Sequence, residues 1–246
     1  MIEIDRNRFS INIKQLWFCD EPYDIEHMDA IYFYSTKKDV HAAGFEKEVF
    51  STLIIDTTKS LDAMWAGMQR SSCRARIKRA ERDGITVGIN EGYEEFIEIN
   101  REFRSNKGLI PMNYSLDYYM KYGILFIFRE GDEILGGHFY LKDDLNMRSL
   151  VAASQRLNID EDKKTLVGNG NRLIIWEAMK YANANGISCF DMGGFYSGAE
   201  PDPEKENINQ FKQGFGGEIC NVYNYRKSYS LKFRLAEVLM DFKGRF

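Results

Sequence analysis

The sequence predicts an α+β fold in which a mixed, mostly antiparallel β-sheet is flanked by helices. Two observations lead to this prediction. Short runs of β-branched and aromatic residues, typical of strands, alternate with segments whose apolar residues recur at helical spacing. Tight turns such as "GDE" and "DDLN" separate three of the strands, which is typical of an antiparallel meander. Strands and helices mixed in this way indicate an α+β domain.

The N-terminal part of the chain is rich in strand signals. Residues 10–20, 29–35 and 49–56 are runs of apolar, β-branched and aromatic residues bounded by polar turns. Apolar residues then recur at helical spacing from residue 61 to residue 80, and Gly84 stands where a C-terminal glycine would end that helix. We interpret residues 1–83 as a β-rich extension that ends in a basic helix.

The order of elements changes after Gly84, and we interpret residues 84–246 as one domain with a C-terminal tail. The strands expected here are residues 85–90, 124–130, 133–142, 147–154 and 187–194. The helices expected here are residues 93–106, 116–123 and 167–186. An acidic, proline-containing loop, a short helix, a final β-hairpin and a basic amphipathic tail complete the domain.

Composition narrows the classes of function. A net charge of −4 argues against a dedicated nucleic-acid-binding protein, although it leaves a local basic patch and transfer RNA open. The four cysteines form no CxxC pair and there are only three histidines, so no metal site is expected. The chain does not start like a signal peptide, and no apolar run is long enough for a membrane span. We therefore expect a cytoplasmic protein.

The stretch "LVGNGNRLIIWEA" is a candidate binding site for a phosphate or pyrophosphate. Gly168 and Gly170 are expected just before a helix, where glycine lets the backbone approach a ligand and unpaired amides point outward. Arg172 could add a bidentate contact. The alternative is a structural glycine turn in which Asn169 or Asn171 caps the helix.

Several motifs together resemble a known family. "RSSCRARIKRAERDGITV", "NRLIIWEAMKYANANGISCFDMGG" and "NQFKQGFGGE" are similar to the Fem family of peptidoglycan bridge-forming transferases, and the order of elements resembles the GNAT superfamily of N-acyltransferases. The resemblance implies a GNAT-like sheet, preceded by a truncated first GNAT-like unit. It also implies that residues 168–172 cradle the pyrophosphate of acetyl-CoA or another acyl-CoA, used as co-substrate without a metal.

The resemblance implies catalytic roles for three residues. Lys212, in the Phe-Lys-x-x-Phe-Gly turn, would act near the transferred carbonyl, where a cation stabilises a developing oxyanion. Asp191 would accept a proton or hold the acceptor amine, and Tyr196 would protonate the leaving group. The alternatives are a solvated lysine on a short helix and an aspartate that only caps the loop backbone.

The basic segment 70–82 is a candidate acceptor site. Arg74 and Lys78 are spaced as i and i+4, which places them on one helix face, where they could clamp an anionic cell-envelope precursor. The alternative is a solvated helix face.

We therefore predict an N-acyltransferase that moves an acyl group from acyl-CoA to an amine, such as a small molecule or an envelope precursor. An aminoacyl-tRNA-dependent transferase of the Fem type is a second interpretation, and the short N-terminal region is expected to disfavour it. A binding module that has the fold but no catalysis is a third.

Overall fold

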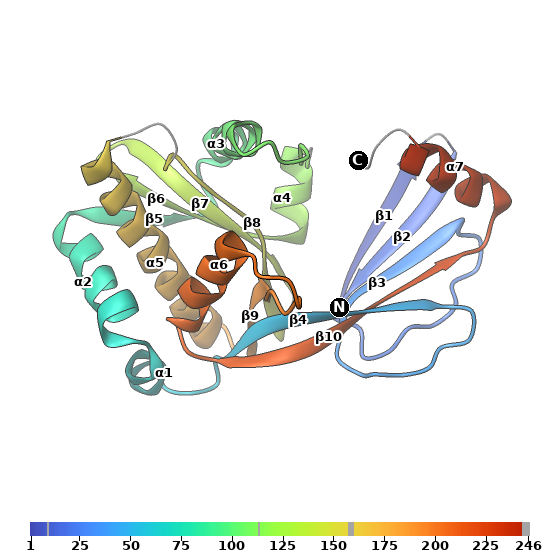
Figure 1. Cartoon of the computed structure of the whole chain (residues 1–246), viewed down its shortest axis with the longest axis horizontal. Helices are drawn as coiled ribbons and strands as arrows, with labels where there is room; N and C mark the ends of the chain where they lie inside the picture. Colours follow the sequence, from blue (N-terminus) through green and yellow to red (C-terminus); the bar gives the residue numbers. More distant parts are fainter. Residues whose placement is uncertain (9, 113, 157–159, 243–246) are drawn as a thin grey trace. The chain divides into compact units, whose positions relative to one another are not determined.

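The computed structural model describes residues 1–8, 10–112, 114–156 and 160–242 (Figure 1). The chain divides into two compact units, one made of Met1–Thr52 and Ile219–Phe246 and the other of Leu53–Glu218. Strands β4 (Glu46–Asp56) and β10 (Glu218–Ser228) cross from one unit to the other along the chain. No helix in the part of the chain that the structure describes is long and apolar enough to cross a membrane.

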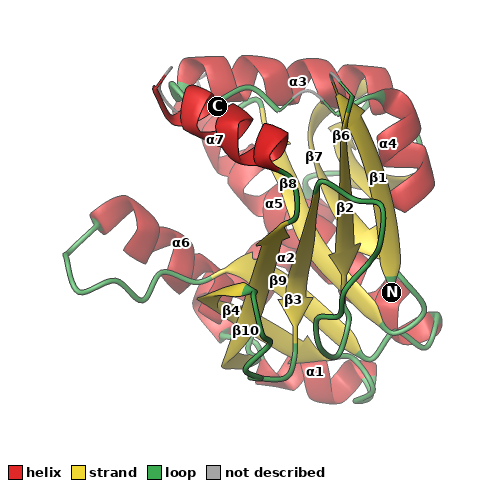
Figure 2. Cartoon of the chain, turned by 90° about the vertical axis from the view of Figure 1, so that its right-hand side faces the viewer, coloured by secondary structure: helices red, strands yellow, loops and turns green. Residues whose placement is uncertain are grey.

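The first unit is a sheet with strand order β1-β2-β3-β10-β4. Strands β1 (Ile2–Arg8) and β2 (Ile11–Trp17) form an antiparallel pair, β2 pairs in parallel with β3 (Ala30–Thr36), and β3 pairs antiparallel with β10. Helix α7 (Leu231–Phe242) follows β10 (Figure 2). A small core forms where alternate apolar residues of these strands meet on one side of the sheet; its buried members are Leu16, Cys19, Ile31, Phe33 and Tyr225.

The second unit continues from β4 with strand order β4-β9-β8-β7-β6-β5. The strands are β5 (Ile85–Ile89), β6 (Gly123–Glu130), β7 (Glu133–Lys142), β8 (Asn146–Ser154) and β9 (Cys189–Gly194). Strands β5 to β8 pair antiparallel, as the tight turns predicted, and β8 pairs in parallel with β9. The predicted mixed, mostly antiparallel sheet is confirmed.

Helices cover both faces of this second sheet (Figure 1). Their bounds are α1 Leu61–Gly67, η1 Arg70–Arg74, α2 Ala75–Arg82, α3 Tyr93–Asn106, α4 Leu116–Tyr122, α5 Glu161–Ala184 and α6 Pro203–Gln213. Alternation along β7 assigns the faces: His138 lies against Asn171 of α5, whereas Phe139 contacts Tyr119 of α4. Helices α5 and α2 therefore cover one face, and α3 and α4 cover the other.

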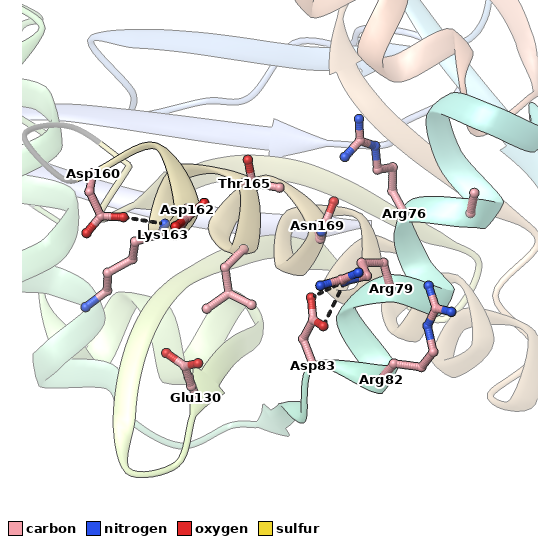
Figure 3. A pocket seen from close by; sticks show the side chains of 12 residues that line it. Arg76, Arg79, Arg82, Asp83, Glu130, Asp160, Asp162, Lys163, Thr165 and Asn169 are labelled. Atoms are coloured by element: carbon pink, nitrogen blue, oxygen red, sulfur yellow. Dashed lines mark hydrogen bonds and ion pairs between the residues drawn. The ribbon is translucent and has the colours of Figure 1, made fainter.

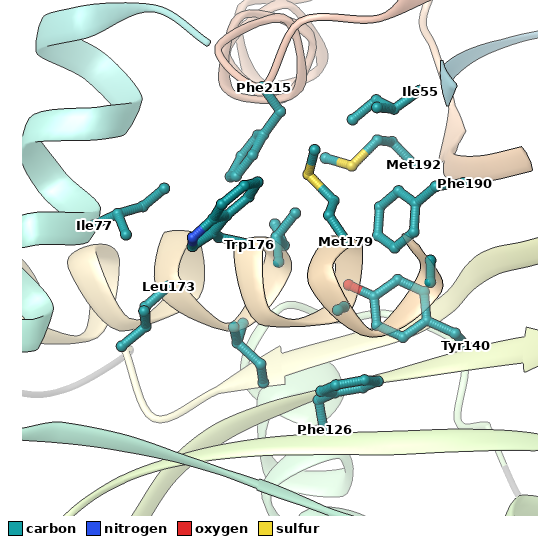
Figure 4. Close-up of a cluster of buried hydrophobic side chains, with 14 of the residues drawn as sticks. Ile55, Ile77, Phe126, Tyr140, Leu173, Trp176, Met179, Phe190, Met192 and Phe215 are labelled. Atoms are coloured by element: carbon teal, nitrogen blue, oxygen red, sulfur yellow. The ribbon is translucent and has the colours of Figure 1, made fainter. Parts of the chain in front are cut away.

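The main core surrounds α5, which packs there against the sheet, against α1 and α2 and against Phe215 (Figure 4). Trp176 and Met179 of α5 lie in it with Tyr140 of β7 and Phe190 of β9, and all four are buried. Phe215, which follows α6, is buried in the same cluster. This core fixes the positions of the strand ends and of α6, and those elements carry the candidate site.

The structure differs from the expected elements in four places. Strand β1 was not anticipated, the helix expected from residue 61 breaks at the extended residues Met68 and Gln69, and β10 replaces the expected final hairpin. Helix α5 begins at Glu161, earlier than the expected start at residue 167. The reason is a local cap: the side chain of Asp160 accepts a hydrogen bond from the Lys163 amide at 2.8 Å, and acidic residues suit the first helical turn.

Along the chain, the compact units change between Thr52 and Leu53 and between Glu218 and Ile219. The basic helix belongs to the second unit, because α2 packs against α5, and residues 219–246 belong to the first unit. Whether either unit is a functional domain in its own right stays a prediction.

Candidate functional site

The candidate site lies where β8 and β9 end their pairing. Their parallel ladder extends over residues 146–148 of β8 and 189–191 of β9. Strand β8 continues to Ser154 along β7, while β9 continues to Gly194 and then enters a loop. Arg148 and Asp191 are thus the last paired residues at the point where the two strands separate. Strand ends that lead into glycine-containing loops are common positions for ligands in mixed sheets.

Asp191 is held by two donors at this point. Its side chain forms an ion pair with Arg148 of β8, and its other carboxylate oxygen accepts the Gly193 amide at 2.7 Å. The residue is only 4% exposed. A buried carboxylate needs such partners, since an unpaired one would be strongly destabilising. The expected local cap of the loop backbone is therefore present, together with an ion pair that sequence reasoning did not find.

Lys212 of α6 brings a second cation to the same place. Its ammonium group donates to the Gly194 carbonyl oxygen at 2.5 Å. Burial lowers the pKa of Lys212 to about 8; the nearby Asp191 carboxylate raises it and the Arg148 guanidinium lowers it further. Lys212 is therefore a half-buried amine close to the neutral range rather than a freely solvated lysine. A shifted pKa of this kind, next to named charges, is typical of functional sites.

Helix α6 is anchored to the loop after β9, and this fixes the position of Lys212. Asp202 caps the helix by accepting a hydrogen bond from the Lys205 amide at 3.1 Å. The side chain of Asn209, which is 9% exposed, accepts from the Tyr196 amide at 2.9 Å and donates to the Tyr196 carbonyl at 2.7 Å. These two hydrogen bonds to the backbone of Tyr196 tie the loop to the helix turn before Lys212.

The hydroxyl of Tyr196 is engaged within its own loop. It donates to the Glu200 carbonyl oxygen at 2.5 Å, and the ammonium group of Lys205 lies 4.8 Å from the centre of its ring. The structure thus places Asp191 and Lys212 together but holds the Tyr196 hydroxyl by another contact. Its role as a proton donor stays a prediction.

The phosphate loop expected at residues 168–172 is not a loop. All five residues lie within α5, well after its first turn. Their backbone amides therefore donate hydrogen bonds within the helix and are not available to a ligand. The expected loop conformation was wrong because the helix begins earlier, at the cap formed by Asp160, whereas the cofactor-binding role of these residues stays a prediction. That true N-terminus carries Glu161 and Asp162, and their negative charge opposes a pyrophosphate.

The two glycines of this stretch differ in their surroundings: Gly170 packs closely against the sheet, whereas Gly168 faces open space. A Cβ added at Gly170 would lie 2.5 Å from the ring of Phe128, so glycine lets α5 approach β6 closely, whereas a Cβ at Gly168 would meet no atom within 4 Å. The Asn169 side chain is buried and lines a cleft together with residues of α2.

The remaining side chains of the stretch tie α5 to its neighbours. Asn171 lies 3.2 Å from the ring nitrogen of His138, which is buried on the sheet. Arg172 donates to the Ser72 carbonyl at 2.6 Å, and its guanidinium lies 4.8 Å from the ring centre of Phe211. These contacts give both side chains a structural role within the fold.

The two residues expected to clamp an acceptor lie apart from the arginine row of their helix. Arg74 is half-buried in η1, and its Nε has no hydrogen-bond partner among the residues that the structure describes. Lys78 is exposed, with its ammonium group 5.9 Å from the ring centre of Trp65. Arg76, Arg79 and Arg82 instead line a cleft against α5. The proposed clamp at Arg74 and Lys78 remains untested.

Two residues of the site escaped sequence reasoning. Arg148 stands inside a mostly apolar strand, which was a usable signal, because a charged residue at an inward position needs a partner. Asn209 gave no such signal, since most asparagine side chains are exposed and nothing local distinguishes a buried one. No group of His, Cys, Asp or Glu side chains within residues 1–8, 10–112, 114–156 and 160–242 is arranged to hold a metal ion.

Comparison with known proteins identifies the fold. No protein-family model and no curated protein sequence matches the chain. The C-terminal domain of a protein described as a lysylphosphatidylglycerol synthetase, from Agrobacterium fabrum, superimposes with a TM-score of 0.61 at 13% identity, covering 98% of this chain and 87% of that one. FemX superimposes with a TM-score of 0.60 at 15% identity, covering 87% and 75%.

A third structure, L-PGS from Bacillus licheniformis, has a TM-score of 0.56 at 15% identity and covers 85% of this chain and 71% of that one. At such identities the similarity shows the fold alone. The chain therefore has a Fem-like GNAT fold, as its motifs indicated.

Proposed function

We propose that this chain is an acyltransferase that passes an acyl group to an amine at the separation of β8 and β9. The observation that carries the proposal is Lys212: a half-buried ammonium group with a pKa lowered to about 8, beside an ion-paired Asp191. The shared fold with FemX and with synthetases of lysylphosphatidylglycerol supports the same class of reaction.

The reaction proceeds by direct attack. The acceptor amine adds to the carbonyl carbon of the donor, and the carbonyl oxygen becomes a tetrahedral oxyanion. The ammonium group of Lys212 stabilises this oxyanion in a partly water-excluded site. Collapse of the intermediate breaks the bond to the leaving group, which takes up a proton while the new amide nitrogen loses one.

Asp191 fits a positioning role in this scheme. Both of its carboxylate oxygens already accept a hydrogen bond, one from Arg148 and one from the Gly193 amide. Its negative charge raises the pKa of Lys212 and so favours the ammonium form that the oxyanion requires. Tyr196 reaches a leaving group only if its hydroxyl releases the Glu200 carbonyl.

Two donors fit the proposal. Acetyl-CoA or another acyl-CoA is the donor implied by the GNAT resemblance. An aminoacyl-tRNA is the donor implied by the Fem resemblance, and one observation favours it: the first turn of α5 carries Glu161 and Asp162, which disfavour a pyrophosphate at that helix end. For the acceptor we propose a small-molecule amine or an anionic envelope precursor, met in the cytoplasm.

The test is Lys212→Met, assayed with each donor in turn. Loss of an oxyanion-stabilising group lowers kcat by about two to three orders of magnitude. The matched control is Lys180→Met, which removes a surface lysine that pairs with Glu177 on α5, and its kcat stays within about twofold of the wild type. A folded Lys212→Met variant with normal kcat contradicts the role of Lys212. No transfer by the wild-type chain from either donor would instead support a non-catalytic binding module.

A further inference from the structure

We propose that the cleft between α2 and α5 binds a ligand that carries both a phosphate group and a primary ammonium group. The cleft has a volume of about 900 Å³, which is within the usual range for small-molecule sites. Residues of α2, of the first half of α5 and Glu130 of β6 line it (Figure 3). Neither Lys212 nor Asp191 is among the lining residues, so this site is separate from the proposed transferase centre.

One wall of the cleft supplies cations. Arg76, Arg79 and Arg82 follow each other at three-residue spacing along α2, so they lie on neighbouring turns of one helix face. Arg79 pairs with Asp83 at 2.8 Å. Arg76 and Arg82 form no ion pair with any residue that the structure describes, and both are exposed. Two guanidinium groups are thus free to bind a phosphate, which they match in geometry.

The other end of the cleft supplies anions. Asp160 and Asp162 lie at the start of α5, and Glu130 lies at the end of β6, away from the arginine wall in Figure 3. Lys163, the one lining cation at this end, pairs with Glu133 at 2.8 Å. Neither Asp162 nor Glu130 has an ion-pair partner in the described part of the chain. These carboxylates suit a primary ammonium group.

A buried amide lies between the two ends. Asn169 is 2% exposed, lines the cleft from α5 near Arg79, and its side-chain nitrogen has no hydrogen-bond partner among the described residues. A buried donor without a partner is destabilising, because it has lost its hydrogen bonds to water. A small rotation of the side chain toward an acceptor on a ligand removes that cost. Asn169 is the observation that marks this cleft as a binding site rather than a gap between two helices.

The distribution of charge selects the ligand class. Four basic and four acidic side chains line the cleft, so its net charge is zero while its two ends have opposite sign. A polyanion such as a nucleoside triphosphate would be attracted by α2 but repelled by the carboxylates. A zwitterion with a phosphate and an ammonium group satisfies both ends at once. An aminoalkyl phosphate, free or as the headgroup of a lipid, has this chemistry.

The experiment titrates the full-length protein with O-phosphoethanolamine and follows amide chemical shifts by NMR. We expect shifts for residues of α2 and of the first turns of α5. Inorganic phosphate alone and ethanolamine alone should each bind at least about tenfold more weakly, because each satisfies one end only. Equal affinity for inorganic phosphate and for the zwitterion would overturn the proposal.

Matched variants test each end. Arg76→Gln and Arg82→Gln should each lower the affinity for O-phosphoethanolamine about fivefold to tenfold. Arg70→Gln, which removes an arginine that does not line the cleft, should leave this affinity unchanged. Asp162→Asn should lower the affinity for O-phosphoethanolamine to a similar extent. The neighbouring Glu161 pairs with Lys164 and does not line the cleft, so Glu161→Gln should leave the affinity unchanged. Equal effects of a variant and its control would show nonspecific charge attraction and would also overturn the proposal. All five positions are exposed, so these variants should fold.

Vesicles distinguish the two sources of this chemistry. Binding to phosphatidylcholine vesicles that contain phosphatidylethanolamine, with loss in Arg76→Gln, identifies a lipid headgroup. Binding of soluble O-phosphoethanolamine without vesicle binding identifies a free aminoalkyl phosphate. Binding to neither rejects the site, whatever the outcome for Lys212→Met.

Discussion

At the scale of single residues, the electrostatics of Lys212 depend on two neighbours of opposite charge. Burial lowers the pKa of its ammonium group, Asp191 raises it and Arg148 lowers it. Because Arg148 also pairs with Asp191, the arginine acts on the lysine both directly and by holding the carboxylate. The proposed chemistry needs the ammonium form, which is present below a pH of about 8 and lost above it.

This charge arrangement predicts the pH dependence of turnover. The kcat of the wild type should fall as pH rises through about 8, and Arg148→Met should move this falling limb to higher pH, since it removes a positive charge that lowers the pKa of Lys212. Full pH profiles of kcat measure the shift.

The control for this shift is Arg129→Met, which removes an arginine of β6 that pairs with Glu91. It should leave the limb in place. Two results would contradict the assignment of this titration to Lys212. One is a fall in kcat at an unchanged pH in Arg148→Met, and the other is the same fall in Lys212→Met. Arg148→Met should also destabilise the fold, because it leaves the carboxylate of Asp191 buried with one charged partner fewer.

At the scale of elements, helix α5 has two glycines with opposite surroundings. Gly170 faces the ring of Phe128 at a distance that leaves no room for a methyl group, whereas Gly168 faces open space. Both have ordinary helical positions, and glycine weakens a helix interior relative to alanine. Gly170 therefore lets α5 lie close to β6, but it lowers the stability of the helix at that position.

The two glycines predict opposite changes in stability. Gly170→Ala should destabilise the fold by about 1–3 kcal/mol, because the added methyl group overlaps Phe128. Gly168→Ala should stabilise it by up to about 1 kcal/mol through helix propensity alone. Urea denaturation with both variants measures the difference. If Gly170→Ala instead kept full stability and lost only affinity for acyl-CoA, the packing explanation would be wrong and the expected cofactor role would be restored.

At the scale of the whole molecule, the two compact units have separate hydrophobic cores. Phe33 of the first unit is fully buried, with its ring 5.1 Å from that of Tyr23 and 5.9 Å from that of Phe45. Phe126 of the second unit is fully buried against Tyr140 and Tyr181. Separate cores allow the units to differ in local stability.

This organisation predicts localised losses of hydrogen-exchange protection. Phe33→Ala should cost about 3–5 kcal/mol and reduce the protection of amides in β2 and β3 more than that of amides in β6 and β7. Phe126→Ala should produce the reverse pattern. Equal loss in both units for both variants would show that the chain unfolds as one cooperative unit.

The sequence alone predicted most of the second sheet, because strand and helix periodicities are local. The meander β6-β7-β8 and helices α3 and α4 follow from alternation, tight turns and helical spacing within each segment. The motifs around Asp191 and Lys212 indicated a Fem-like GNAT fold, which structural similarity confirms. Strand β1 was missed, since charged residues interrupt its apolar alternation.

Only the tertiary structure decided which of the predicted site residues meet. Arg148 and Asp191 are far apart in sequence, and their pairing depends on the parallel register of β8 with β9, which no local pattern contains. The pKa of Lys212 depends on its burial and on the charges of Asp191 and Arg148, which are distant along the chain. The glycines of α5 appeared as a phosphate loop because glycine permits both close ligand approach and close packing, and only the position of Phe128 distinguishes the two.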